Sequence, residues 1–546
     1  MSKKAEAKRY WKRLEQPNGP LGWWVLPPPF ALIAWIFLPV TLGDFVADDY
    51  VFIATGRMVD TPLAAFWQSH FYEPYYFRPL GVLSWWVATR LFGLDYASHS
   101  LINLILHCAN AALLFCLLRA LALRASAVIA GVVLFALGPF ALATMLWPSN
   151  RFDLLAVGFL LAQAIAMVRA LQGNVFAFPF AMLAALGACW SKESAFAIST
   201  MMTLVALTAS SVSWRLRGTL FVLLGAVIGG AFFWRQHVVT DAYAVASANP
   251  LQQVMEGARA LLSSVPRLAE LTMGALMMSW FGGGVVAACS LALLFVAREA
   301  GLPVSRRGRI GGALLIFFAA FIVQTPLAGA FAPMLDGAAF GTATFARFYY
   351  APWAVAAVVV ALVLARGRFA DIGAVMVVAV TAAASLGAQP LAEAFAEWTR
   401  REVKPMSVAA TKLVDAEGAA PCVYVLLGTQ EKQPYFRMFS DVTVKARTAS
   451  PDKTWRCHVM TESTPWLFAF PSGVAPLELP LRTITNLDGN AKADSAWGGI
   501  RYRYRLPAKD LAGLPSARYF DWRDGRFVDV TEEVRSGIRK VAPKDW

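Results

Sequence analysis

The sequence predicts a polytopic α-helical membrane protein with a small soluble domain at its C-terminal end. Of its 546 residues, 58% are hydrophobic and only 15% are charged, whereas a soluble globular protein carries about 25% charged residues. Apolar runs long enough to cross a bilayer recur between residues 22 and 390. From about Arg400 the composition turns polar, which indicates a soluble region of mixed α/β or β type.

The apolar runs and their basic flanks predict about eleven transmembrane helices. They are expected at residues 22–42, 98–122, 126–146 and 153–171, on both sides of residue 191, at 218–235, in the stretch that ends at Arg298, and at 310–331, 348–365 and 372–388. A long polar and aromatic loop, 43–97, follows the first span. It contains the amphipathic stretch PLGVLSWWVATRLFG, which suits a helix lying on the membrane surface.

Three regions follow from this pattern: a basic N-terminus, 1–21, a membrane domain, 22–390, and a soluble C-terminal domain, 391–546. The opening MSKKAEAKRYWKR has no cleavable signal architecture, so we expect it to be cytoplasmic. Basic turns at alternate ends of the spans then place the C-terminal domain outside the cytoplasm. The net charge of +14 is spread over such turns, which argues against a nucleic-acid partner. We expect a bacterial inner membrane protein, with the endoplasmic reticulum of a eukaryote as the alternative.

The C-terminal domain contains three strand patterns. PCVYVLLG predicts a buried strand, RYRYRL a strand with one basic face, and YFDWRDGRFVDV a hairpin that turns at Asp524 and Gly525. Two of the six cysteines, Cys422 and Cys457, lie in this domain. If the domain is outside the cytoplasm, they are candidates for a disulfide. The cysteines and the five histidines show no zinc-site spacing.

Two adjacent carboxylates, Asp48 and Asp49, follow the first span in the run GDFVADDY. Neighbouring acids at a membrane exit repel each other and are costly to desolvate. A solvated loop end is the simple explanation, and a catalytic base is the functional one.

Further charged residues interrupt apolar sequence on the predicted extracytoplasmic side, and His107 lies within the second span. An arginine or lysine at this depth often only extends to lipid headgroups. Several cations and two acids on one face suit the binding of a phosphate group beside a carboxylate base better. The charged residues are Arg78, Arg151, Asp153, Lys192, Glu193 and Arg347.

Six short elements occur in the order DDY, YYFRPL, NLILHCANAALL, WPSNRFDLLA, SKESA and RFYYAP. In type and order they resemble the motifs of the GT-C glycosyltransferases, above all the O-mannosyltransferase branch that includes the transmembrane TPR-repeat mannosyltransferases. The resemblance covers residues 20–390. The chain departs from that branch because it has no TPR repeats and because the region from about Arg400 is unlike the family, which leaves the acceptor open.

The resemblance implies a GT-C-like fold and a mannosyltransferase-like reaction. A sugar would pass with inversion from a polyprenyl-phosphate donor to a hydroxyl of a glycan, glycolipid or protein acceptor, outside the cytoplasm. Either Asp48 or Asp49 would be the base. The implied contacts of the donor phosphate are Arg78, Arg151, Lys192 and Arg347, and the supporting residues are Asp153, Glu193, His107 and Tyr350. For His107, a packing histidine bonded between helices is the alternative. The family includes metal-independent and metal-dependent members, and Asp48 and Asp49 can hold Mg²⁺ or Mn²⁺.

Other functions remain as alternatives. A transferase of an aminosugar or pentose to lipid A or a cell-wall glycan would use the same chemistry. A transporter would need two related halves with broken helices, which the sequence does not show. A non-catalytic scaffold would leave the acids dispensable.

Overall fold

The computed structural model describes most of the helical region and parts of the C-terminal region. The described residues are 22–46, 49, 52–53, 56, 61–67, 77–208, 212–238, 311–320, 324, 347–365, 369–416, 422–427, 457–461, 466–469, 502–505 and 517–538. The predicted N-terminal region, 1–21, the span expected before Arg298, and Asp48 lie outside them.

The described residues include six helical stretches long and apolar enough to cross a membrane. These are Trp23–Leu42, Tyr96–Ala120, Pro148–Leu171, Trp214–Val238, Arg347–Leu364 and Ala370–Ala409. Four shorter apolar helices accompany them at Ala125–Leu137, Ala177–Cys189, Ser194–Leu207 and Gly311–Ala320. The chain is therefore a multi-pass membrane protein, as predicted, and the total of eleven spans stays a prediction.

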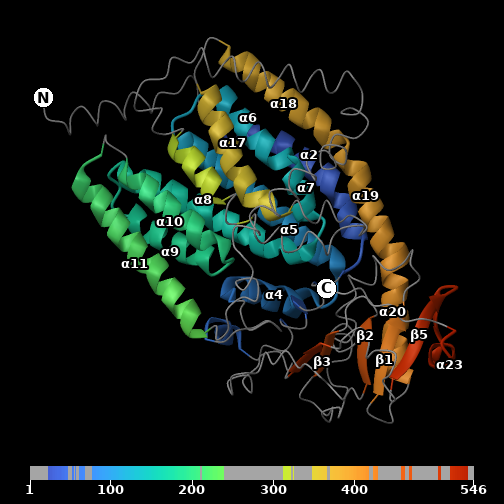
Figure 1. The fold of residues 1–546 in the computed structure, drawn as a ribbon. Helices are drawn as coiled ribbons and strands as arrows, with labels where there is room; N and C mark the ends of the chain where they lie inside the picture. The colour runs from blue at the N-terminus through green and yellow to red at the C-terminus, as the bar shows by residue number, and fades with distance from the viewer. Residues whose placement is uncertain are drawn as a thin grey trace, which may run out of the picture.

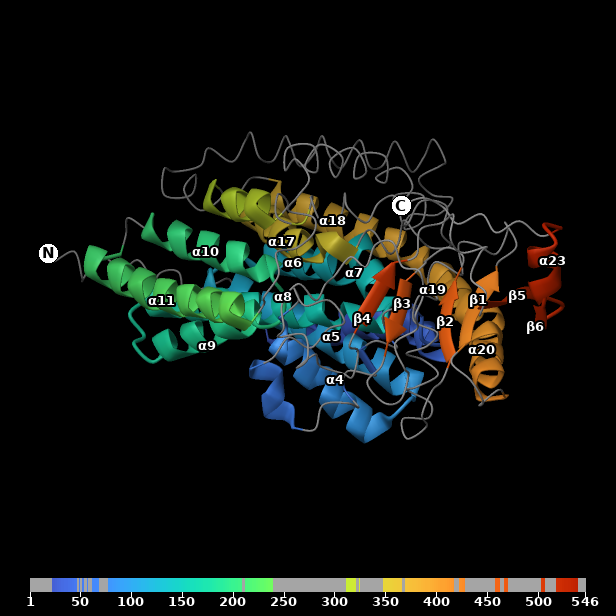
Figure 2. The same cartoon turned by 60° about the horizontal axis from the view of Figure 1, so that its bottom comes forward.

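Most of the predicted spans coincide with helices. The first consists of η1 (Trp23–Val25), α2 (Pro27–Phe37) and η2 (Leu38–Leu42). The others are α5 (Tyr96–Ala120), α8 (Arg151–Leu171), α9 (Ala177–Cys189), α10 (Ser194–Leu207), α11 (Trp214–Val238), α17 (Tyr350–Leu364) and α18 (Ala370–Leu386). Figures 1 and 2 place α9, α10 and α11 at the end of the helical body away from the strands.

The third predicted span, 126–146, is wrong as a single helix. It is divided into α6 (Ala125–Leu137) and α7 (Pro139–Met145). Gly138 between them is extended, with φ −73° and ψ 162°. Proline disfavours a helical conformation in the residue before it and has no N–H to continue the helix, so the Gly-Pro pair causes the break.

The amphipathic stretch of the first loop forms α4 (Pro79–Phe92). Proline begins this helix, and Gly93, with φ 57°, ends it. One face buries Val82 and Trp85 against the helical body. The other face exposes apolar side chains, among them Leu91, which suits the membrane surface.

Helix α8 lies at the centre of the packing, against α5 on one side and α9 on another. Gly158 lets α5 approach α8 closely, because a Cβ atom at this position would lie 2.7 Å from Oδ1 of Asn110. Asn110 in turn donates a hydrogen bond to the Leu154 carbonyl of α8, at 2.9 Å. The start of α8 is therefore fixed relative to α5.

The C-terminal region forms a mixed sheet in the order β2-β1-β5-β6. The strands are β1 (Cys422–Leu427), β2 (Cys457–Thr461), β5 (Ala517–Arg523) and β6 (Arg526–Asp529). β1 runs parallel to β2 and β5, whereas β5 and β6 form the predicted hairpin. Asp524 and Gly525 both have positive φ, 50° and 76°, as a two-residue hairpin turn of type I′ requires.

The remaining strands form a second, antiparallel pair, β3 (Trp466–Ala469) and β4 (Tyr502–Arg505). Strand β4 confirms the strand predicted from RYRYRL. The short helix α23 (Thr531–Arg535) packs against β5.

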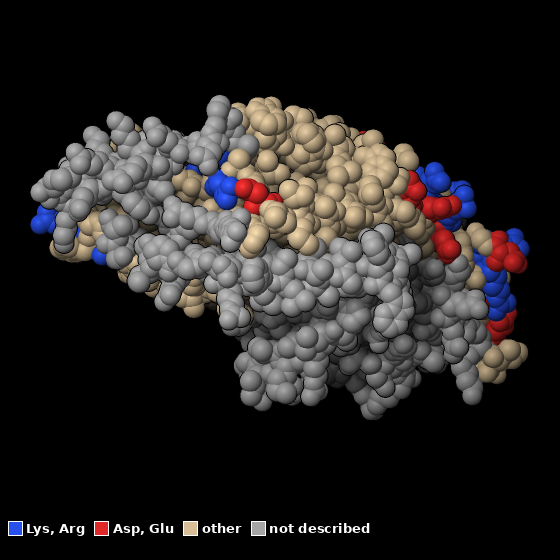
Figure 3. Space-filling view, turned by 90° about the horizontal axis from the view of Figure 1, so that it is seen from above, with Lys and Arg blue, Asp and Glu red and all other residues tan. Residues whose placement is uncertain are grey.

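A nearly unbroken run of helices connects the membrane domain to the sheet. α18 is followed by α19 (Ala388–Trp398), the π-helical turn η7 (Thr399–Val403) and α20 (Lys404–Ala416). Figure 1 shows this run descending along the helical body to the strands, and α20 packs against β6. The predicted domain boundary at residue 391 falls inside the run, where α19 packs against α2 and η2, and it stays a prediction. In Figure 3, charged residues gather at the end where α20 and the strands lie, beside a broad uncharged face.

The disulfide between Cys422 and Cys457 stays a prediction, and the strand register supports it. The two residues are direct partners on the parallel strands β1 and β2, and neighbouring strands lie about 4.8 Å apart, within disulfide reach. Labelling of free thiols in the unfolded, unreduced protein should therefore find two fewer than after reduction. Cys422→Ser should make the thiol of Cys457 available to the label without reduction. Cys116→Ser should only lower the number of labelled thiols by one, because it removes the thiol of residue 116. Labelling of all six thiols without reduction would contradict the prediction.

Candidate functional site

Asp49 lies buried just beyond the first span, where the chain turns toward α8. One carboxylate oxygen accepts a hydrogen bond from the Val46 N–H at 3.0 Å, and the other from the Ser149 N–H at 2.8 Å. The side chain has no exposed surface. The backbone of two separate segments therefore orients this acid. Its neighbour Asp48 lies outside the described residues.

Arg78 and Glu193 form an ion pair that joins the start of α4 to the start of α10. Nε of Arg78 lies 3.0 and 2.9 Å from the two carboxylate oxygens, and a terminal nitrogen lies 2.7 Å from one of them. Burial alone would raise the pKa of Glu193, but the charge and the hydrogen bonds of Arg78 outweigh it and lower the pKa. The guanidinium also lies over the ring of Phe152, 5.3 Å from its centroid.

Lys192 and Asp153 form a second ion pair, which joins the α9–α10 turn to the first turn of α8. Both side chains are more than nine-tenths buried. Burial lowers the pKa of Lys192, Asp153 counteracts this, and the charges of Arg78 and Arg347 lower the pKa further. Because Arg78 and Arg347 both act on Lys192, the three cations lie in one electrostatic neighbourhood.

Arg347 belongs to the short turn η6 (Arg347–Tyr349), directly before α17. It donates a hydrogen bond to Oδ1 of Asn150 at 3.2 Å. Its guanidinium lies over the rings of Trp147 and Phe348, 4.5 and 5.0 Å from their centroids. The flat cation is thus supported by aromatic rings, an arrangement that a lysine cannot reproduce.

We call Arg78, Lys192 and Arg347 the cation group. Two members of this group are in ion pairs: Arg78 pairs with Glu193, and Lys192 pairs with Asp153. The supporting role of the two acids at a phosphate site stays a prediction. In the described part of the chain, Arg235 is a further cation whose charge acts on Glu193.

Arg151 lies elsewhere, among α4 and α5. It is completely buried, donates to Oδ1 of Asn103 at 3.2 Å and to the His99 carbonyl at 3.1 Å, and stacks on Trp85, 4.3 Å from the ring centroid. The acid whose charge acts on it is Asp49. The structure thus associates Arg151 with the acidic segment, and its contact with the donor phosphate stays a prediction.

His107 and Tyr350 form a buried chain of hydrogen bonds between helices. Nε2 of His107 lies 2.9 Å from the Ala136 carbonyl, which can only accept, so this nitrogen carries the proton. Nδ1 then accepts from the Tyr350 hydroxyl at 2.7 Å, and the hydroxyl accepts from Asn110 at 3.2 Å. These contacts brace α5 against α6 and α17, and a supporting role of His107 and Tyr350 at the donor site stays a prediction.

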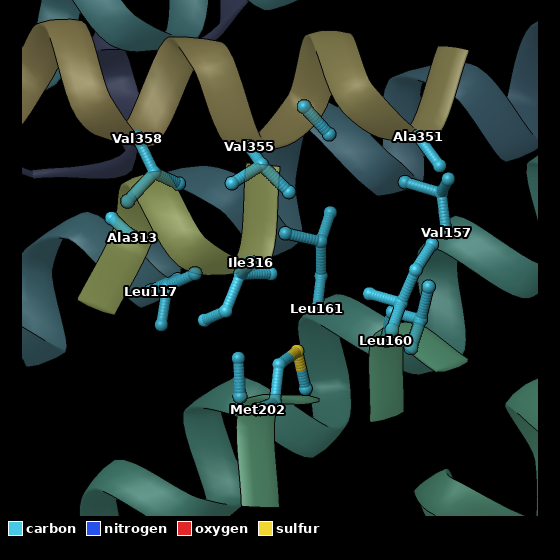
Figure 4. A pocket seen from close by; sticks show the side chains of 13 residues that line it. Leu117, Val157, Leu160, Leu161, Met202, Ala313, Ile316, Ala351, Val355 and Val358 are labelled. Carbon is cyan, nitrogen blue, oxygen red and sulfur yellow. The ribbon is translucent and has the colours of Figure 1, made fainter. Parts of the chain in front are cut away.

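An apolar pocket begins about one helical turn below the cation group. Val157 follows Asp153 by four positions on α8, and Ala351, in the first turn of α17, follows Arg347 of η6 by four. Figure 4 shows side chains of α8, α10 and α17 converging on the pocket. Charged residues therefore lie at or just before the N-terminal ends of these helices, which line an apolar space farther along.

A metal site is not evident in the part of the chain that the structure describes: no three His, Cys, Asp or Glu residues are grouped to hold an ion. Binding of Mg²⁺ or Mn²⁺ by Asp48 and Asp49 stays a prediction.

Sequence reasoning missed the uncharged residues that hold the cations. Asn150 and Trp147 support Arg347, and Asn103 and Trp85 hold Arg151. The signal available was the run WPSN directly before Arg151, because aromatic and amide side chains beside a charge in apolar sequence often stabilise it.

No protein-family profile and no curated protein matches the chain. Two solved structures resemble it distantly. The oligosaccharyltransferase of Archaeoglobus fulgidus, tethered with an acceptor peptide, is 13% identical, with a TM-score of 0.43 over 78% of this chain and 63% of that chain. ArnT from Cupriavidus metallidurans, bound to undecaprenyl phosphate, is 14% identical, with a TM-score of 0.32 over 80% of this chain and 90% of that chain. The chain thus spans less than two thirds of the archaeal enzyme, and TM-scores this low assign no function.

The Arg78–Glu193 pair should make stability depend on pH. The pKa of Glu193 in the folded protein is lowered from 4.5. The contribution of Glu193 to the free energy of unfolding is therefore complete above about pH 4.5, and it is lost as the pH falls through the pKa of the folded protein. Glu193→Gln should cost about 1.5–3 kcal/mol at neutral pH, and the difference from wild type should shrink in more acidic buffer. Thermal unfolding in detergent measures this.

The control is Glu397→Gln, which breaks the exposed pair with Arg401 and should cost no more than about 0.5 kcal/mol. An equal loss in both variants, or a difference that does not change with pH, would contradict the assignment.

Proposed function

We propose that the chain is an inverting glycosyltransferase of the extracytoplasmic face of a bacterial inner membrane. It would move a sugar from a polyprenyl-phosphate donor to an acceptor hydroxyl. The observation that carries the proposal is that Lys192 and Arg347 lie just before α10 and α17, two of the helices that line the apolar pocket. A ligand that fits both the cations and the pocket has an anionic head and a hydrocarbon tail.

The chemistry explains why cations and a base suffice. The acceptor oxygen attacks the anomeric carbon as the bond from that carbon to the phosphate oxygen breaks. A carboxylate of the acidic pair takes the hydroxyl proton. The polyprenyl phosphate leaves with the bonding electrons, and its charge is stabilised by Arg78, Lys192 and Arg347. A glycoside hydrolase needs a second carboxylic acid to protonate its leaving group. A phosphate leaves without being protonated, so this reaction needs no such acid.

The surroundings of each cation suit this role. Asp153 and Glu193 offset the cost of burying Lys192 and Arg78 before a donor arrives. The guanidinium of Arg347 lies over aromatic rings and donates to an amide oxygen, which fixes its orientation. This fixed, planar orientation supports our proposal that Arg347 is a direct phosphate ligand. We propose Arg151 as a residue that serves the acidic segment.

Arg347→Lys tests the phosphate site. The variant loses the stacked, planar fork and should bind polyprenyl phosphate at least about tenfold more weakly, since 1.4 kcal/mol corresponds to tenfold. Binding of polyprenyl phosphate in detergent measures it without knowledge of the sugar. Arg215→Lys is the matched control. Arg215 also lies over a tryptophan, Trp214, but it is at the N-terminal end of α11, outside the cation group. Equal affinities of wild type and both variants would indicate simple anchoring at the interface.

The acidic pair is tested by Asp48→Asn and Asp49→Asn. Loss of the base should lower turnover by about 10²–10⁴-fold with donor binding retained. Release of polyprenyl phosphate from a panel of polyprenyl-phosphate monosaccharides, with and without a chelator, is the measurement. Asp371→Asn, which alters the exposed pair with Arg124, should behave as wild type. Wild-type turnover in both Asn variants would overturn the proposed reaction.

A further inference from the structure

Each of residues 44–46, shortly before the acidic pair, is held by contacts with other parts of the chain. The Asp44 N–H donates to the hydroxyl of Thr399 at 3.0 Å. Phe45 packs edge-on against Tyr96 and His99, with ring centroids 5.1 and 5.4 Å away. This segment therefore has two neighbours far apart in the sequence, the start of α5 and the turn η7.

Val46 completes the connection to the acid. Its carbonyl accepts from the indole N–H of Trp147 at 3.2 Å and from the Asp49 N–H at 3.0 Å. Its own N–H donates to the Asp49 carboxylate. A displacement of residues 44–46 would therefore be transmitted directly to the carboxylate of Asp49.

The π-helical geometry of η7 explains how two residues of one helical run, Thr399 and Lys404, both contact Asp44. Besides the Thr399 contact, the ammonium of Lys404 lies 3.7 Å from the Asp44 carboxylate. In an α-helix, residues five positions apart point about 140° apart, since each residue turns about 100°. Here the Lys404 N–H bonds to the Thr399 carbonyl, the i to i+5 bond of a π-helix, and the wider turn brings the two side chains closer to the same side of the helix.

The contact between η7 and the segment is close. Thr399 has no exposed surface. A Cβ atom on Gly43 would lie 2.7 Å from the Thr399 hydroxyl oxygen, so a glycine is needed at this point. The hydroxyl donates its proton to the Ala396 carbonyl at 2.9 Å and so presents a lone pair to the Asp44 N–H.

We propose that Thr399, presented by the π-helical turn η7, is a positioning residue for the acidic pair. Its hydroxyl anchors residues 44–46, so that the carboxylates that follow lie where a base must be. Lys404 contributes a second, weaker contact. The inference rests on the proposed function, because a base must lie within hydrogen-bond reach of the acceptor hydroxyl and a misplacement of about 1 Å can cost 10²-fold in rate.

The competing explanation is that Thr399 merely bonds back to its own helix, as buried threonines often do. Thr399→Val keeps the shape and removes the hydroxyl, whereas Thr399→Ser keeps the hydroxyl. Thr203→Val is the matched control, because Thr203 is equally buried and bonds back to the Ser199 carbonyl of α10, at 2.8 Å. Thr203 does not take part in any of the contacts of residues 43–46 that are described above.

Two measurements on the purified full chain test the proposal. Hydrogen–deuterium exchange of a peptide that contains Asp44 should quicken in Thr399→Val and stay as in wild type in Thr399→Ser and Thr203→Val. Turnover of the polyprenyl-phosphate sugar should fall about tenfold or more in Thr399→Val, with KM for the donor unchanged and with rescue by serine. If Thr399→Val does not fold, Lys404→Gln, whose side chain is more than half exposed, should shift both readouts in the same direction by less.

Each outcome has a definite meaning. Unchanged exchange in Thr399→Val would show that the hydroxyl does not anchor the segment. Faster exchange with wild-type turnover would show an anchor that does not position the base, and this too would overturn the inference. If the wild type releases no polyprenyl phosphate from any donor, the proposed function fails, and the exchange experiment alone then decides whether Thr399 anchors the segment.

Discussion

The buried ion pair between Lys192 and Asp153 is the constraint on which the candidate site depends. Two charges removed from water cost several kcal/mol each unless they compensate each other at close range. This requirement holds the α9–α10 turn against the first turn of α8. Arg78 and Glu193 repeat the arrangement between α4 and α10. The helices that line the apolar pocket are therefore aligned at their charged ends by electrostatics and along their lengths by packing.

The pairing also sets the charge that a ligand meets. Among the described residues of the site, three cations and two acids leave a small positive excess, and the guanidinium of Arg347 is held by rings and an amide. A strongly positive cavity would be costly to keep empty within an apolar body. A nearly neutral one can exist without ligand and still favour an anion, because the guanidinium and ammonium groups are already oriented.

The sequence predicted the elements well because hydropathy and turn chemistry are local. The spans at α5 and α8 and the hairpin at Asp524–Gly525 follow from patterns of a few residues. Arg151 shows what spacing along the chain does not reveal. It lies two positions from Asp153, but residues two apart on a helix point to nearly opposite sides, and its contacts are with residues of α4 and α5. The turn η7 could not be predicted, because its π-helical bond is stabilised by contacts with a segment more than 350 positions earlier in the chain.

The helical run from α18 to α20 links the orientation of the sheet to that of the membrane domain, because α20 packs against β6. Each residue of a helix adds a rotation of about 100° and a rise of about 1.5 Å. An insertion or deletion of a single residue in α20 would therefore turn the face that packs against β6 away from that strand. In an evolving lineage, the sequences of the strands can vary more freely than the length of this helix, which can change only by nearly whole turns. Homologous proteins that share the arrangement should differ in the strands and agree in the length of the run from η7 through α20.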